Sequence, residues 1–72
     1  MGTMHIVDGK GDTVVKWATE EEAAVKEAEQ IFKEKVKQGF AAFEVGSTTD
    51  QRVHKFDKNA AEIILIPPMV GG

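Results

Sequence analysis

The sequence contains no cysteine, which excludes disulfide bonds, thiolate metal sites and a nucleophilic or thioester-forming thiol. It also lacks a long apolar run. The longest, Ile63 to Ile66, is followed by two prolines and is far shorter than the ~20 residues that a membrane-spanning helix needs. No charged-then-apolar segment typical of a secretory signal opens the chain. We therefore expect a cytoplasmic protein with no membrane partner.

Basic residues are too few and too scattered to form a phosphate-binding surface. The chain has nine Lys and Arg residues against twelve Asp and Glu residues, with a net charge of −3. Proteins that bind nucleic acid usually concentrate cations on one face, so we expect no nucleic-acid partner. A chain of 72 residues supports one modest core, so we expect a single domain that is a monomer on its own.

The first half of the sequence predicts a β-hairpin followed by an amphipathic helix. Two β-prone runs, Met4 to Val7 and Thr13 to Trp17, flank turn-forming residues. Thr19 followed by Glu22 has the spacing of a capping box, and we expect a helix from Thr19 to Gln38. Its apolar stripe predicts four core residues: Val25, Ala28, Phe32 and Val36. Gly39 should end the helix.

The second half predicts three further strands. Phe40 to Val45 should form a strand with Ala41, Phe43 and Val45 on one face, and Arg52 to Phe56 a weaker one. Glu62 to Ile66 contains four consecutive branched aliphatic residues, which is typical of a strand covered on both faces in the middle of a sheet. Pro67 and Pro68 end this strand because neither can donate a ladder hydrogen bond.

The order of these elements, β-β-α-β-β-β, predicts an α+β domain in which one helix covers one face of a mixed four- or five-stranded sheet. We place the domain at residues 4–68, taking Met4 as the natural start, and a flexible tail at residues 69–72.

The tail has the properties of a segment that enters a narrow channel in a partner. Pro67 and Pro68 favour an extended path away from the sheet. Gly71 and Gly72 have no Cβ atoms to block close backbone approach. Met69 and Val70 join this stiff base to the thin tip. The working group is therefore expected to be the carboxylate of Gly72.

These residues resemble the end of the ubiquitin-like and sulfur-carrier families, above all the small subunit of molybdopterin synthase, in which the last strand runs into two prolines, two variable residues and Gly-Gly. The order of elements also resembles ubiquitin. The resemblance is close only over residues 57 to 72, whereas the rest matches in pattern. It implies a ubiquitin-like β-grasp fold.

The resemblance further implies that an adenylating enzyme uses ATP to activate the Gly72 carboxylate. The activated group would then either accept sulfur as a thiocarboxylate, for delivery to a larger synthase subunit, or be attached to a lysine of a target protein. The domain itself would be a carrier or modifier with no catalytic residue, no bound cofactor and no metal, so it is not an enzyme. The alternative is a noncovalent protein interaction module in which the tail is passive.

The last strand also suggests a partner surface. Alternate residues of a strand face opposite sides, so either Ile64 with Ile66 or Ile63 with Leu65 lies away from the helix. An apolar pair there, with Ile64 and Ile66 as the candidates, would mark a partner site unless loops cover it.

His5 and His54 lie in separate strands with no cysteine nearby, so we interpret them as surface or core-edge residues, not metal ligands.

Overall fold

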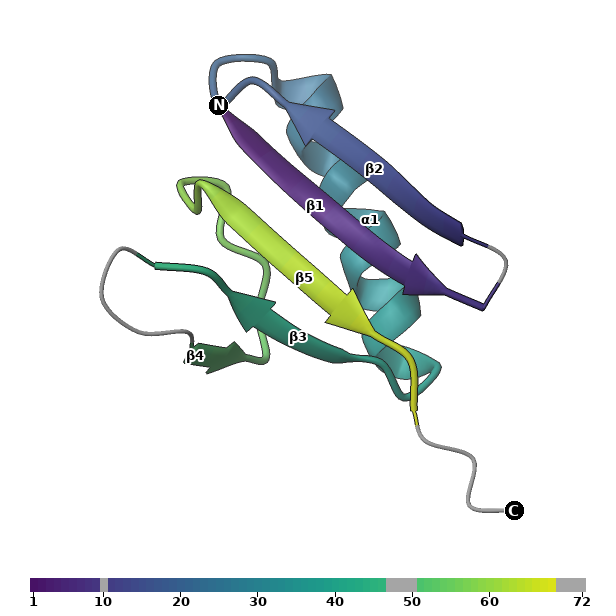
Figure 1. Cartoon of the computed structure of the whole chain (residues 1–72). Coiled ribbons are helices and arrows are strands. Elements are labelled where there is room, and N and C mark those ends of the chain that lie inside the picture. Colours follow the sequence, from purple (N-terminus) through teal and green to yellow (C-terminus); the bar gives the residue numbers. More distant parts are fainter. Residues whose placement is uncertain (10, 47–50, 69–72) are drawn as a thin grey trace.

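The computed structural model describes residues 1–9, 11–46 and 51–68, and shows a single helix lying across one face of a five-stranded sheet (Figure 1). The predicted α+β class and order of elements are confirmed. The elements are β1 (Gly2–Asp8), β2 (Gly11–Trp17), α1 (Glu22–Lys37), β3 (Ala41–Glu44), β4 (Gln51–Val53) and β5 (Glu62–Ile66).

The sheet has the strand order β2-β1-β5-β3-β4, with β5 in the central position. β1 and β5 run parallel, and the other neighbours are antiparallel, so the sheet is mixed as predicted. The first and last strands of the sheet therefore lie side by side at its centre (Figure 1). The expectation that Glu62 to Ile66 forms a central strand is confirmed.

The first strand begins earlier than the sequence suggested. It starts at Gly2, which is buried and pairs with Trp17, instead of at Met4. A Cβ atom added at Gly2 would overlap the indole ring of Trp17, so the close approach of these two residues requires glycine. Glycine contributes nothing to an apolar pattern, and the pattern therefore pointed to Met4.

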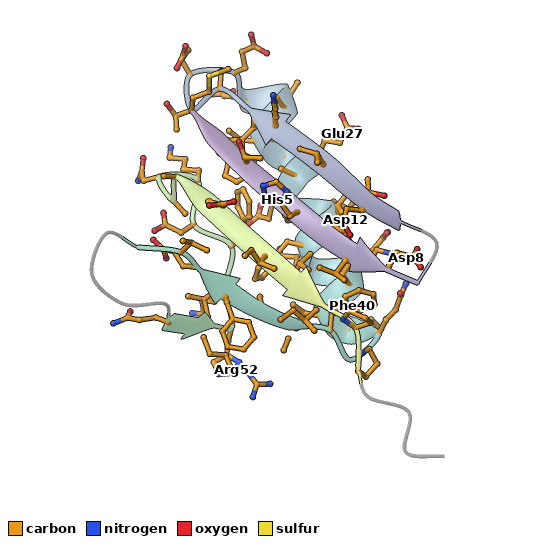
Figure 2. The ribbon with its side chains drawn as sticks, viewed as in Figure 1. His5, Asp8, Asp12, Glu27, Phe40 and Arg52 are labelled. Carbon is orange, nitrogen blue, oxygen red and sulfur yellow. The ribbon has the colours of Figure 1, made fainter. Side chains whose placement is uncertain are left out.

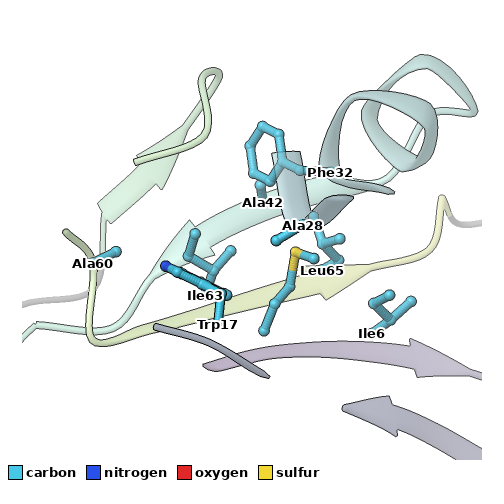
Figure 3. Close-up of a cluster of buried hydrophobic side chains, with 9 residues drawn as sticks. Ile6, Trp17, Ala28, Phe32, Ala42, Ala60, Ile63 and Leu65 are labelled. Atoms are coloured by element: carbon cyan, nitrogen blue, oxygen red, sulfur yellow. The ribbon is translucent and has the colours of Figure 1, made fainter. Parts of the chain in front are cut away.

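The core lies between α1 and the sheet (Figure 3). Ala28 and Phe32 are fully buried as predicted, whereas Val25 and Val36 are only partly buried because one helix on an open sheet shields its flanks incompletely. The indole Nε1–H of Trp17 donates a hydrogen bond to the carbonyl oxygen of Lys58 at 2.9 Å. The buried core residues are Met4, Ile6, Trp17, Ala28, Phe32, Ala42, Ala60, Ile63 and Leu65.

The helix is shorter than predicted, and the capping box is wrong. The N-cap residue is Glu21, and no side chain caps it. Thr19 instead donates its hydroxyl to Glu20 Oε2 at 3.2 Å, within a turn that the Glu21 N–H closes on the carbonyl of Ala18. The turn uses the residues that would have formed the first helical turn. The C-terminal end agrees with the prediction, since Gly39 follows the helix with φ of +102°.

The third and fourth strands also differ from their predicted limits. β3 is Ala41–Glu44, one residue shorter at each end, although Val45 still donates its N–H to the carbonyl of Glu62. β4 ends at Val53 because the chain then turns Phe56 towards the core, where its ring centroid lies 5.0 Å from that of Trp17. Among the described residues, no helix is long and apolar enough to cross a bilayer.

Candidate functional site

The base of the C-terminal tail lies at one end of the central strand. β5 ends at Ile66, at the same end of the sheet as the carboxyl terminus of α1 (Figure 1). Pro67 is half-buried and Pro68 is exposed. Pro68 lies against the turn after the helix, because a Cβ atom added to Gly39 would lie only 3.4 Å from Pro68 Cγ. The chain therefore leaves the sheet over the turn between α1 and β3.

The residues beyond this base carry the functional prediction, and they lie outside the described residues. These are Met69, Val70, Gly71 and Gly72. The predicted flexibility of the tail and the activation of its carboxylate therefore stay predictions. Both proline positions lie where the sequence placed them, directly after the central strand.

The structure decides which pair of β5 residues faces away from the helix. Ile63 and Leu65 are both 0% exposed and belong to the core, so Ile64 and Ile66 lie on the opposite, outer face. Ile66 is 43% exposed. The expectation that both faces of this strand are covered is therefore wrong. A run of four aliphatic residues does not require cover on both faces of the strand. Only alternate residues, Ile63 and Leu65, pack in the core beneath α1.

Aromatic and aliphatic neighbours extend this exposed pair into a patch. Ile64 pairs across the sheet with Phe43 of β3, and the two residues share a face. Val45, the residue directly after β3, lies on the same side two residues beyond Phe43. Phe43, Val45, Ile64 and Ile66 line a shallow hollow of about 280 Å³, and we call these four residues the outer patch.

A polar pair borders the outer patch. His5 on β1 pairs with Ile64, and its side chain lies on the face of the sheet turned away from α1 (Figure 2). Its Nε2 atom lies 2.9 Å from Oε2 of Glu62, with side-chain exposures of 36% and 40%. Such a half-exposed pair contributes about 0–1 kcal/mol to stability, so its main effect is to place a polar, hydrogen-bonded edge beside the apolar residues.

The other histidine lies apart from this pair. His54 is exposed and follows β4. Within the described ranges, no group of three or more His, Asp or Glu side chains is arranged to hold a metal ion.

Part of this site depends on strand pairing that the sequence does not specify. The alternation of Ala41, Phe43 and Val45 predicts that they share a face, but not which residues of β5 lie beside them. Once β3 and β5 are paired antiparallel, Phe43 falls opposite Ile64. The contact between His5 and Glu62 depends on the parallel pairing of β1 with β5, which joins segments almost a whole chain apart.

Comparison of the chain with protein-family models, with curated protein sequences and with solved structures finds no match.

Proposed function

We propose that this chain is a ubiquitin-like β-grasp protein that carries an activated carboxyl group at Gly72. The supporting observation is that the central strand β5, which is paired on both sides, runs directly into Pro67 and Pro68, so that residues 69–72 follow the middle strand of the sheet. The strand order and the single helix on one face are compatible with a β-grasp. The remaining support is the Gly71-Gly72 ending itself.

The chemistry requires a partner enzyme, because a free carboxylate is a poor acyl donor. A carboxylate oxygen of Gly72 would attack the α-phosphorus of ATP, and pyrophosphate would leave. A hydrosulfide ion or a lysine amine would then attack the acyl carbon, and AMP would leave. The first acceptor gives a thiocarboxylate and the second an isopeptide bond. The partners are thus an adenylating enzyme and either a sulfur-accepting synthase subunit or a lysine-bearing target.

The test compares the chain ending at Gly72 with two variants, one lacking Gly72 and one extended by a single alanine. Each is incubated with ATP and a lysate that contains adenylating enzymes, and its intact mass is measured. We expect replacement of oxygen by sulfur, or an isopeptide-linked adduct, only with the unmodified chain. Melting temperatures of the three proteins should agree, because the tail follows the last strand. Equal modification of the extended chain, or none of any chain, would contradict the proposal.

The outer patch supports the second candidate, a noncovalent interaction module. Phe43, Ile64 and Ile66 form an apolar surface next to the tail base, as expected for a docking site. In this reading a partner binds the patch whether or not Gly72 has a free carboxylate. Partner binding that survives extension past Gly72 but is lost in Ile66→Asp would favour the module over the carrier.

A further inference from the structure

A second hollow lies on the helix side of the domain, away from the outer patch. It has a volume of about 490 Å³ and lies between α1 and the segment His54 to Phe56. Its apolar lining is Phe32, Val36 and Phe56. Val36 and Phe56 are half-buried, so their side chains are partly accessible from the hollow.

Aromatic packing holds the wall of this hollow in place. The ring of Phe56 lies 5.0 Å from that of Trp17 and 5.8 Å from that of Phe32, measured between centroids. Trp17 is in turn hydrogen-bonded to the carbonyl of Lys58, two residues after Phe56. Phe56 and Lys58 therefore hold the segment after β4 against the core. The hollow is thus already formed before any ligand binds.

The charged lining has an excess of cations. Lys33, Lys37 and Lys55 line the hollow, and among the described residues that do so Glu29 is the one acid. Glu29 lies 4.0 Å from Lys33, at the limit of an ion pair, and leaves the other two lysines without an acid in the lining. This local excess occurs on a chain whose net charge is −3, so it is a property of this surface and not of the composition.

We propose that this hollow binds an acidic peptide segment of a partner protein. One bulky apolar side chain of the peptide occupies the hollow and packs against Val36 and Phe56, while flanking carboxylates face Lys37 and Lys55. A bare phosphate group would make no favourable contact with the apolar part of the lining, and an open surface hollow cannot enclose a lipid chain. A peptide that presents an apolar residue between acids complements both linings. This site is separate from the tail and the outer patch, and it goes beyond the proposed carrier function.

The probe is an acetylated, amidated heptapeptide with a central phenylalanine between three aspartates on each side. It is titrated into the ¹⁵N-labelled full chain, and amide chemical shifts are followed. We expect the shifts to concentrate at residues 29–37 and 54–56, and Trp17 fluorescence to change because Phe56 contacts its ring. Replacing the central phenylalanine by serine should remove most of the binding. Raising the salt concentration should weaken it.

The matched variants reverse two lysines each and carry the same net charge. Lys37→Glu with Lys55→Glu changes the hollow, whereas Lys16→Glu with Lys26→Glu changes exposed lysines outside its lining. We expect the first pair to weaken binding about tenfold and the second to leave it within about twofold. Equal losses in both variants, shifts centred on the outer patch, or undiminished binding of the serine peptide would each overturn the proposal.

Discussion

Replacing Gly2 by alanine tests whether the start of β1 is as closely packed as the structure shows. The added Cβ atom would overlap Cζ2 and Cε2 of the Trp17 indole and would stand 2.8 Å from the carbonyl oxygen of Ala60. The indole cannot simply turn aside, because its N–H is bonded to the Lys58 carbonyl and its ring contacts Phe56. One methyl group therefore disturbs three separate segments.

The size of the effect follows from the cost of inserting a methyl group into a well-packed site. Such overpacking typically destabilises a protein by about 1–3 kcal/mol. In a domain of 60–100 residues each kcal/mol lowers Tm by roughly 4–8 °C. We therefore expect a clear drop in Tm for Gly2→Ala, accompanied by altered fluorescence of Trp17, the sole tryptophan.

Gly9→Ala is the matched control, since an added Cβ at Gly9 would meet no atom within 4 Å. Its free energy of unfolding should stay within about 0.5 kcal/mol of the original. The assay is thermal and urea unfolding of the three proteins, followed by Trp17 fluorescence and circular dichroism. If Gly2→Ala melts with the control, residues 2 and 3 are not part of the packed sheet and the account of β1 is wrong.

Three further substitutions test the core, the helix end and the outer patch. Phe32→Ala should lower the free energy of unfolding by about 3–5 kcal/mol, because Phe32 is 1% exposed; near-normal urea unfolding would show that the core lies elsewhere. Gly39→Ala should cost about 1–2 kcal/mol in the same assay, because φ is +102° and Pro68 lies close, and an unchanged midpoint would argue against this turn. Ile66→Ser should lower the free energy of unfolding by only about 1 kcal/mol, because the side chain is 43% exposed and so only partly buried; a loss as large as that of Phe32→Ala would mean that Ile66 supports the core.

The parts of the fold that were predictable are those in which neighbours along the chain decide the structure. The helical spacing of Ala28 and Phe32 marks a buried face, and the aliphatic run of β5 followed by two prolines marks a strand and its end. Gly39 marks the end of the helix for the same local reason, since few other residues adopt its backbone conformation.

The parts that were missed depend on contacts between distant segments. Thr19 and Glu22 have capping-box spacing, but the chain arriving from β2 forms a turn there, and Thr19 bonds to Glu20 instead. The outward direction of Ile64 is set by α1 covering the alternate residues, which no local pattern specifies. The hollow beside Phe56 exists because that ring reaches Trp17, a contact between residues in different halves of the chain.

The parallel pairing of β1 with β5 has a consequence for how the protein is made. Ribosomal synthesis releases the partners of the central ladder in sequence, β1 first and β5 last. The hairpin and α1 can form locally, but Met4 and Ile6 have no strand beside them on the β5 side until Ile63 and Leu65 have emerged. Closing that ladder requires a loop spanning most of the chain, so it is the late, entropically costly step of folding. Until then the edge of β1 that will pair with β5 stays open, and a chaperone that binds extended apolar strands would find its substrate there.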